Sequence, residues 1–347
     1  MSLPGETDPK TFHFRNLHPR IFLGTASDRY AGWIGQIYSQ DRYEGRITKR
    51  TKAIAGKNFS EEVLPVDSVE EYFEHFPVLE IDFTFYRLLL DENGQPTPNY
   101  QVLNTYSQHL KAGDRIILKA PQIVTAQKIH QGDRYVDNES YLNPKIFTEQ
   151  YYVPAVKMLG SKLSGIIFEQ EYQRQQDRAP VNEMTRELDD FFRAIPKDTR
   201  YHLELRTDLY LRDQVFEVLK RYGVGQVLSH WTWLPPLRKQ LAKASGRFFN
   251  GGGECVVRLM TPLGMRYEDA YGKAHPFDRP IEGMRQPEMV QETVEIVKAA
   301  IEKGVSVNLI INNRAGGNAP LLAREIAEKL VGKKDSKVSR QLGLWDR

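Results

Sequence analysis

Charged residues recur inside short apolar segments of the sequence, in a pattern that could bring several of them together. In residues 79–86, apolar and polar residues alternate, so that one face would carry Glu80, Asp82, Thr84 and Tyr86. Side chains on a β-strand point to opposite faces in turn, so this face would be entirely polar or amphipathic. The same alternation places further polar residues on one face of other apolar segments: Lys119, Glu169, His202, Glu204, Arg206, Arg258, Asn308 and Asn312.

Two explanations fit this pattern, because buried charges are costly unless they are paired. In the first, Glu80, Glu204, Arg206 and Arg258 form a structural network of salt bridges. In the second, the residues nearest the strand ends line a ligand site. The candidates for acid–base catalysis are then Lys119, Glu169, Glu204 and Tyr86. The two explanations are compatible, and the sequence leaves both open.

The segment 312–318 contains two glycines and runs into a helical pattern. Glycines let backbone N–H groups approach an anion, and the N-terminus of a helix favours negative charge. Arginines could add bidentate contacts, and Arg206 could also orient Glu204. We therefore predict a site for a small phosphorylated or anionic ligand, such as a sugar phosphate or a nucleotide. Its ligand-binding residues would be Arg206, Arg258, Asn312, Asn313, Gly316 and Gly317. The alternative is an ordinary turn with Asn318 as a helix cap.

Other chemistries have weaker support in the sequence. Glu169 and Glu204 could do general acid–base work or hydrolyse a glycoside. Only His202 and His230 lie near predicted strands, which argues against a zinc site and leaves Mg²⁺ or Mn²⁺ as the alternative. We predict neither a metal nor a cofactor. The single cysteine, Cys255, begins a predicted strand and is expected to be structural.

Nucleic-acid binding is the rival function. Basic residues are concentrated between Arg42 and Lys57, and Trp231 and Trp233 could stack on bases. The net charge of +3 is too small to argue for such a partner alone. A non-catalytic binding scaffold is the third possibility, and the sequence does not decide whether the protein is an enzyme.

The elements that position these residues are eight short apolar segments, most of them followed by helical patterns. The predicted strands are 20–24, 78–85, 115–119, 165–169, 201–206, 224–229, 255–260 and 306–312. Strands that alternate with helices indicate a parallel sheet, and eight such units favour a closed (β/α)8, or TIM, barrel. An open doubly wound sheet is the rival, although no G-x-G-x-x-G follows the first strand.

We expect a single domain with long loops at the C-terminal face of the strands, where barrel enzymes hold their active sites. The predicted divisions are an N-terminal extension, 1–19, the barrel, 20–331, and a polar tail, 332–347. The first 20 residues contain no apolar run typical of a signal peptide, and no stretch approaches the roughly 20 apolar residues needed to cross a bilayer. With a lone cysteine, a cytoplasmic location without membrane contact is expected.

The motifs also resemble those of a known family, domain of unknown function 72, also called YecE-like. The resemblance rests on ordered motifs from about residue 20 to residue 331, of which the second-strand motif with Thr84, Phe85, Tyr86 and Arg87 is the most specific. The other matching segments are 23–26, 33–38, 118–121, 202–206, 257–259 and 312–320. The resemblance implies a TIM barrel and leaves the activity open.

The sequence also departs from the pattern of that family. The family typically has Gly-Trp soon after the first strand, where this chain has Ala26-Ser27-Asp28. Its usual Thr-His is Thr125-Ala126 here, and its frequent Arg-x-His-Gly becomes Arg258, Leu259, Met260 and Thr261. If the two missing histidines are catalytic in other members, this protein has lost or changed that activity.

Overall fold

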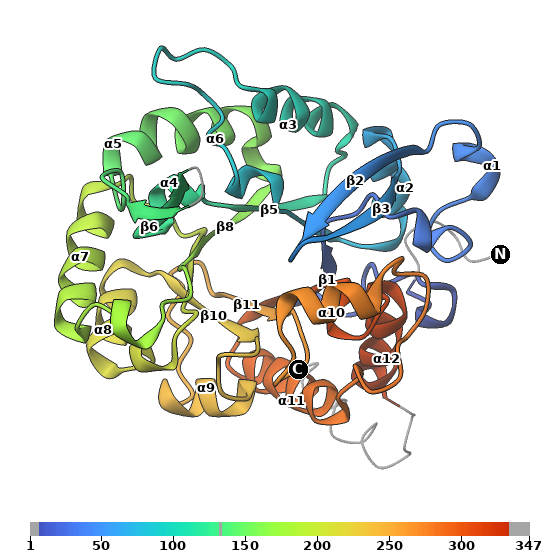
Figure 1. The fold of residues 1–347 in the computed structure, drawn as a ribbon. Helices are drawn as coiled ribbons and strands as arrows, with labels where there is room; N and C mark the ends of the chain where they lie inside the picture. Colours follow the sequence, from blue (N-terminus) through green and yellow to red (C-terminus); the bar gives the residue numbers. More distant parts are fainter. Residues whose placement is uncertain (1–6, 132–133, 333–347) are drawn as a thin grey trace.

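The computed structural model describes residues 7–131 and 134–332, and its centre is a closed barrel of eight parallel strands (Figure 1). Around the barrel the order is β1, β4, β5, β8, β9, β10, β11 and β12, and β12 pairs with β1 to close it. The bounds are β1 Ile21–Ala26, β4 Val78–Ile81, β5 Arg115–Lys119, β8 Leu163–Glu169, β9 Tyr201–Glu204, β10 Gly225–His230, β11 Glu254–Leu259 and β12 Ser306–Ile311. The predicted TIM barrel is confirmed, and the open sheet is excluded.

Helices surround the barrel, and one main helix follows each strand (Figure 1). They are α2 Val69–His75, α3 Pro98–His109, α6 Val153–Leu159, α7 Val181–Ala194, α8 Asp213–Tyr222, α9 Leu237–Lys243, α11 Pro287–Glu302 and α12 Ala319–Val331. Their ends follow local chemistry. In α8, an aspartate lies in the first turn and two basic residues in the last, and Gly223 ends the helix with a φ of 65°. In α12, the Asn318 side chain accepts a hydrogen bond from the Leu321 N–H.

The long connections, predicted to be loops, contain two antiparallel hairpins. They are β2 Thr48–Ile54 with β3 Lys57–Val63, and β6 Lys128–Gln131 with β7 Arg134–Asp137. Short helices also occur there: α1 Gln40–Tyr43, α4 Gln122–Thr125, α5 Pro144–Phe147 and α10 Tyr267–Ala274. The hairpins follow β1 and β5, so they extend from the C-terminal ends of those strands, where the loops were expected to carry the function.

The inside of the barrel is layered. A belt of buried apolar side chains crosses its middle: Ala26, Val78, Ile117, Ile167, Val227, Val256 and Ile310. Two residues further along four of these strands come charged residues, Glu80, Lys119, Glu169 and Arg258. A two-residue step keeps the same face of a strand, so these charges point into the barrel above the belt, towards the C-terminal ends. The belt therefore separates them from the opposite end of the barrel.

The predicted strand 78–85 is too long, because β4 ends at Ile81 and residues Phe83–Phe85 form a 3-10 turn. Thr84 is buried and its hydroxyl donates to the carbonyl of Lys119 at 2.8 Å. Tyr86 is 72% exposed, so the prediction that it points inward from a strand is wrong. At the N-terminus, Phe14 is fully buried and stacks near Phe76, so this part of the extension packs on the barrel. The predicted tail lies, apart from Gly332, outside the described residues.

Candidate functional site

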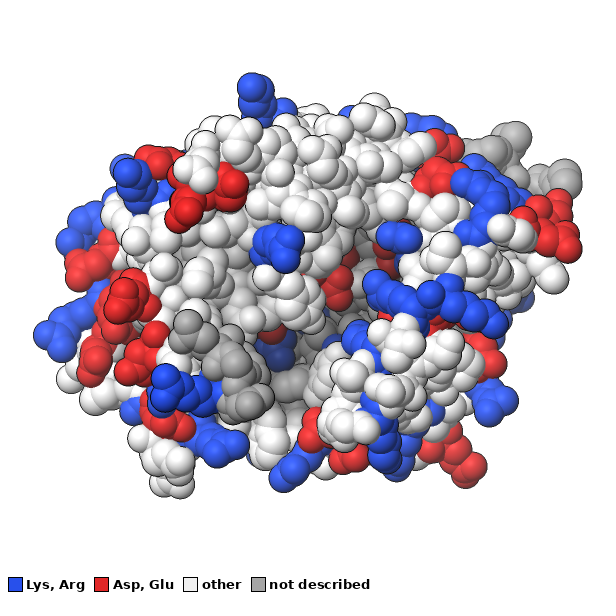
Figure 2. Space-filling view, turned by 45° about the horizontal axis from the view of Figure 1, so that its top comes forward, with Lys and Arg blue, Asp and Glu red and all other residues white. Residues whose placement is uncertain are grey.

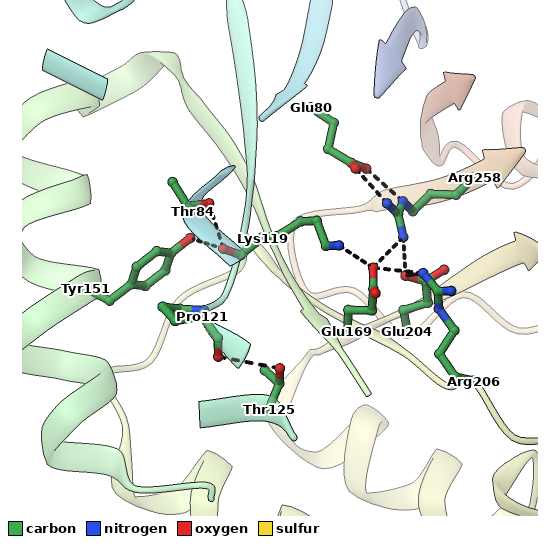
Figure 3. Close-up of polar contacts among 10 residues, drawn as sticks. All are labelled: Glu80, Thr84, Lys119, Pro121, Thr125, Tyr151, Glu169, Glu204, Arg206 and Arg258. Atoms are coloured by element: carbon green, nitrogen blue, oxygen red, sulfur yellow. Dashed lines mark hydrogen bonds and ion pairs between the residues drawn. The ribbon is translucent and has the colours of Figure 1, made fainter. Parts of the chain in front are cut away.

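Arg258 is the centre of an ionic network inside the barrel (Figure 3). Its Nε and Nη2 donate to the two carboxylate oxygens of Glu80, at 2.7 and 2.6 Å. Its Nη1 donates to Glu204, and to Glu169 Oε2 at 3.1 Å. Burial alone would lower the pKa of Arg258, but Glu204, Glu80 and Glu169 hold it well above its ordinary value. The guanidinium is therefore committed to three glutamates from β4, β8 and β9.

Two further cations complete the network at its outer end. Glu169 Oε2 forms ion pairs with Lys119 Nζ at 2.6 Å and with Arg206 Nη2 at 2.8 Å. The same Nη2 lies 3.1 Å from Glu204 Oε2. Burial raises the pKa of Glu169, but Arg206, Lys119 and Arg258 outweigh it and hold that pKa well below the ordinary value. These three cations therefore favour the ionised form of Glu169.

The network divides into two groups by exposure. The inner group is Glu80, Glu204 and Arg258, whose side chains are at most 1% exposed and carry a net charge of −1. The outer group is Lys119, Glu169 and Arg206, whose side chains are 7–14% exposed and carry a net charge of +1. In Figure 2 the molecule is hollowed near the centre of the view, and acidic and basic side chains lie deep in the hollow. The inner group fits the prediction of a structural network of salt bridges, and the outer group faces the open C-terminal end of the barrel.

Aromatic rings and strand-end hydrogen bonds hold the two outer cations. Lys119 Nζ lies 4.1 Å from the ring centre of Phe85, and the Arg206 guanidinium lies 4.5 Å from that of Trp231. The Tyr151 hydroxyl donates to the Lys119 carbonyl at 2.8 Å, as Thr84 also does (Figure 3). Arg206 Nε is buried, and within the described parts of the chain no acceptor bonds to it. An unused donor on a buried cation is costly unless something else binds it.

Tyr86 and Asp82 lie near the outer group on the β4 side of the barrel mouth. Loss of hydration, and then the negative charge of Asp82, raises the pKa of the Tyr86 hydroxyl; Glu169 adds to this effect. Asp82 is half-buried, and among the described residues its carboxylate forms no hydrogen bond or ion pair. Asp82 belongs to the polar face predicted from the sequence, but it was not among the predicted site residues. The sequence did indicate it, because Asp82 follows Glu80 by two residues and so shares its polar face.

The predicted anion cradle after β12 is closed in the structure. The N–H groups of Arg314, Ala315, Gly316 and Gly317 all donate within the chain. The Asn313 side-chain oxygen accepts from Trp33 Nε1 at 3.1 Å and from the Ala319 N–H at 2.8 Å.

The segment 279–281 also lies against the glycines of this turn. A Cβ atom on Gly317 would lie 2.5 Å from the carbonyl oxygen of Arg279. Asn312 is 6% exposed, and its side-chain oxygen accepts a hydrogen bond from the Arg314 N–H. The geometry therefore corresponds to the ordinary turn with Asn318 as helix cap, which was the alternative.

The basic segment between Arg42 and Lys57 is neutralised by its neighbours. Five of its six cations pair with carboxylates: Arg42 with Glu70, Arg46 with Asp67, Lys49 with Glu62, and Arg50 and Lys52 with Glu61. Most of these acids lie on β3 or just after it. The segment therefore offers little unbalanced positive charge to a phosphate backbone.

Among the described residues, the two buried histidines, His202 and His230, do not form part of a metal site. In residues 7–131 and 134–332, no three histidine, cysteine or acidic side chains are grouped so as to hold a metal ion. His202 lies level with the apolar belt, in register with Ile167, and in the described chain neither of its ring nitrogens has a hydrogen-bond partner. His230 Nδ1–H donates to the Thr261 carbonyl oxygen at 2.8 Å. Cys255 is buried, as predicted.

We expect the protein to lose stability as the pH falls from about 6.5 to about 4. Burial lowers the pKa of His75, His202 and His230 from 6.5 to about 4. In this pH range the unfolded chain binds protons at these histidines that the folded chain does not bind, which lowers the free energy of unfolding. The shift in the pKa of His202 alone corresponds to about 3 kcal/mol of that free energy. Asp28 opposes the trend, because burial raises its pKa to about 6 and the folded state binds that proton first.

Urea denaturation at pH 7.5, 6 and 5 measures this effect, and His202→Gln should flatten the dependence by about one proton. Equal free energies of unfolding at pH 7.5 and pH 5 would contradict the assignment.

The chain is similar in sequence and in structure to known proteins of one family. The sequence profile of the family described as protein of unknown function DUF72 matches residues 22–342. The chain belongs to the DUF72 family. No functionally curated protein matches it. The DUF72 family protein of Thermotoga maritima has a similar structure, with a TM-score of 0.55 and 15% identity, over 90% of this chain and 99% of that one. A DUF72 family protein of Enterococcus faecalis has a TM-score of 0.52 and 14% identity, over 92% of this chain and 100% of that one.

Membership in the DUF72 family confirms the resemblance noted in the sequence and supports the barrel fold. At 14–15% identity, the two DUF72 structures share the fold with this chain and carry no information about its ligand. In the described residues, no helix is long and apolar enough to span a membrane. The function of this DUF72 protein must therefore be argued from its own site.

Proposed function

We propose that the barrel mouth binds a small anionic ligand, such as a phosphorylated metabolite, through Lys119 and Arg206. The observation that carries the proposal is the unequal division of charge in the network. The outer group has two cations for one carboxylate, while the inner group has two carboxylates for one cation. An anion at the open end would balance the outer group at little structural cost, because both cations are already held in place.

Arg206 is the main anchor in this proposal. Its Nε lacks an acceptor within the described residues, and only its Nη2 is used by Glu169 and Glu204. An arginine with donors to spare can bind a carboxylate or phosphate through two parallel hydrogen bonds. Arg258 was a candidate for this role in the sequence, but its Nε, Nη1 and Nη2 already donate to glutamates. We therefore assign Arg258 to positioning the glutamates.

If the protein is an enzyme, its groups divide into distinct roles. Glu169 stays ionised, so it would act as a nucleophile or stabilise positive charge. The Tyr86 hydroxyl is protonated at neutral pH, and its raised pKa favours the donation of a hydrogen bond over the transfer of a proton. Lys119 would bind the anion beside Glu169. Glu204 is fully buried and would hold Arg206.

Replacing Arg206 with alanine should reduce the affinity for inorganic phosphate and for sugar phosphates at least tenfold, roughly the worth of one charge-assisted contact. Thermal shift and calorimetric titrations with phosphate, ribose 5-phosphate and glucose 6-phosphate measure this. Arg206→Lys keeps the charge but loses the planar fork, and should bind with intermediate affinity. Arg285→Ala removes an exposed cation paired with Glu325 and is the matched control.

The anion proposal is contradicted if phosphate and sugar phosphates produce no shift, or if Arg206→Ala binds them as well as the unaltered protein. A shift with single-stranded DNA alone, lost at high salt, would favour the nucleic-acid alternative. Unchanged phosphate binding in Glu169→Gln would show that this carboxylate takes no part in holding the anion.

A further inference from the structure

A groove on the rim of the barrel, separate from the outer group, has the features of a second binding site. It lies between the β6–β7 hairpin and the segment 171–177 that follows β8, and its volume is about 460 Å³. Ligand pockets for small molecules start at about 300 Å³, so the groove is large enough for a sugar ring or more. We infer that this groove binds a neutral saccharide, a function beyond the anion site proposed above.

Flat aromatic rings form parts of both walls. Tyr172 lines the groove, and its ring stacks on Trp233 with centres 5.0 Å apart and planes 26° apart. Because Trp233 supports one face of the ring, Tyr172 is a rigid platform. Tyr135, on β7, lines the groove from the hairpin side and is 63% exposed. Rings on two walls suit a ligand with flat or weakly polar faces, such as the C–H faces of a pyranose.

Directional polar groups line the floor of the groove. Gln173 is 7% exposed, and its side-chain oxygen accepts from the Tyr210 hydroxyl at 2.7 Å. Its amide nitrogen donates to Gln127, which fixes both amides. Glu171 is half-buried, which raises its pKa, although the backbone N–H of Lys128 partly offsets this. Each of these groups keeps donor or acceptor capacity for a ligand, because amides and carboxylates form several hydrogen bonds.

The charges of the groove favour a neutral ligand over a nucleotide. Lys128 pairs with Asp177 at 2.8 Å, and the remaining charged residues, Arg174 and Glu171, are of opposite sign. A phosphate-bearing ligand needs a net positive lining, which this groove lacks. Sugar hydroxyls both donate and accept, so a balanced lining of amides, carboxylates and cations can satisfy them. The neutral lining therefore favours a saccharide.

Titration with maltotetraose, cellotetraose and N-acetylchitotetraose tests this inference, by calorimetry and by the tryptophan fluorescence of Trp233 behind the platform. We expect at least one of them to bind, Tyr172→Ala to weaken it about tenfold or more, and Tyr172→Phe to retain it, because the flat face remains. Tyr172→Leu keeps the bulk of the side chain without the flat ring. It is used in place of Tyr172→Ala if the melting temperature of that variant is too low for the titration. Tyr267→Ala, in α10 and outside the groove, is the control.

No binding by any of the three saccharides would overturn the inference, as would binding that Tyr172→Ala and Tyr172→Leu leave unchanged. Adenosine is the comparison ligand, and Tyr172-dependent binding of adenosine without any saccharide would assign the groove to a nucleobase instead. The two proposals fail separately. Arg206→Ala should lose phosphate and keep the saccharide, and Tyr172→Ala should do the reverse.

Discussion

Replacing Arg258 with methionine is expected to lower the free energy of unfolding by roughly 3–5 kcal/mol, the usual result of breaking a buried ion pair by removing one partner. Glu80 would be affected most, because both of its carboxylate oxygens accept hydrogen bonds from Arg258 and would lose them. Burial already raises the pKa of Glu80 even with the guanidinium in place. Without it, Glu80 would be an unpaired buried carboxylate or would have to bind a proton.

The loss in Arg258→Met should therefore grow as the pH rises, because deprotonation of Glu80 then becomes the costly step. Denaturant unfolding at pH 5 and pH 8 measures both the loss and its pH dependence. Adding Glu80→Gln to Arg258→Met should restore part of the stability, since a neutral amide is cheaper to bury than a carboxylate. Arg285→Met, at an exposed ion pair, should change stability by less than about 1 kcal/mol. A fully stable, pH-independent Arg258→Met would refute the structural role of the inner group.

Replacing Gly24 with alanine should cost at least about 3 kcal/mol and could prevent folding, because the barrel has no room for the added methyl group. A Cβ atom at this position would lie 2.0 Å from the carbonyl oxygen of Val78 and 2.7 Å from its Cγ1. Tyr72 also bridges this point, since its hydroxyl donates to the Val78 carbonyl and accepts from the Thr25 N–H. Moving β1 away from β4 would break that bridge as well.

Gly272→Ala is the matched control for Gly24→Ala. Gly272 lies within α10, and the nearest atom to an added Cβ is 3.6 Å away on Phe59. Alanine is the better helix former, so this variant should be neutral or more stable by up to about 1 kcal/mol. Yield of soluble protein and thermal melts of both variants provide the comparison. A Gly24→Ala protein as stable as Gly272→Ala would show that β1 can shift without loss.

The barrel was predictable because its strands are short apolar runs with helices between them, and seven of them end within about two residues of the prediction. The extension of β4 to Phe85 was wrong because alternation of apolar and polar residues continues through a 3-10 turn. In that turn Phe83 packs against Tyr106 of α3, and Phe85 lies beside Lys119. The β2–β3 hairpin was missed for a different reason. Five of the seven residues of β2 are exposed and none is buried, so the strand has no apolar face for the sequence to reveal.

The members of the ionic network were also predictable, since inward charges on strands stand out against an apolar background. Which of these charged residues pair with one another was not predictable from the sequence. Arg258 on β11 bonds to Glu80 on β4, and two other strands, β12 and β1, lie between them around the barrel. Contacts across the lumen depend on how the strands are staggered when the barrel closes, which alternation along one strand does not encode. The glycine turn at Gly316 failed as an anion cradle because a distant segment, 279–281, packs against it.

The pairing of β1 with β12 has a consequence for synthesis of the chain on the ribosome. The barrel is completed by contacts such as Leu23 with Leu309, almost 300 residues apart. Until β12 has been made, β1 and β11 each keep an open edge of unpaired N–H and C=O groups, to which another chain can bind. A nascent chain that stalls before residue 306 is therefore an aggregation hazard, and chaperones that shield strand edges would act on it at that stage.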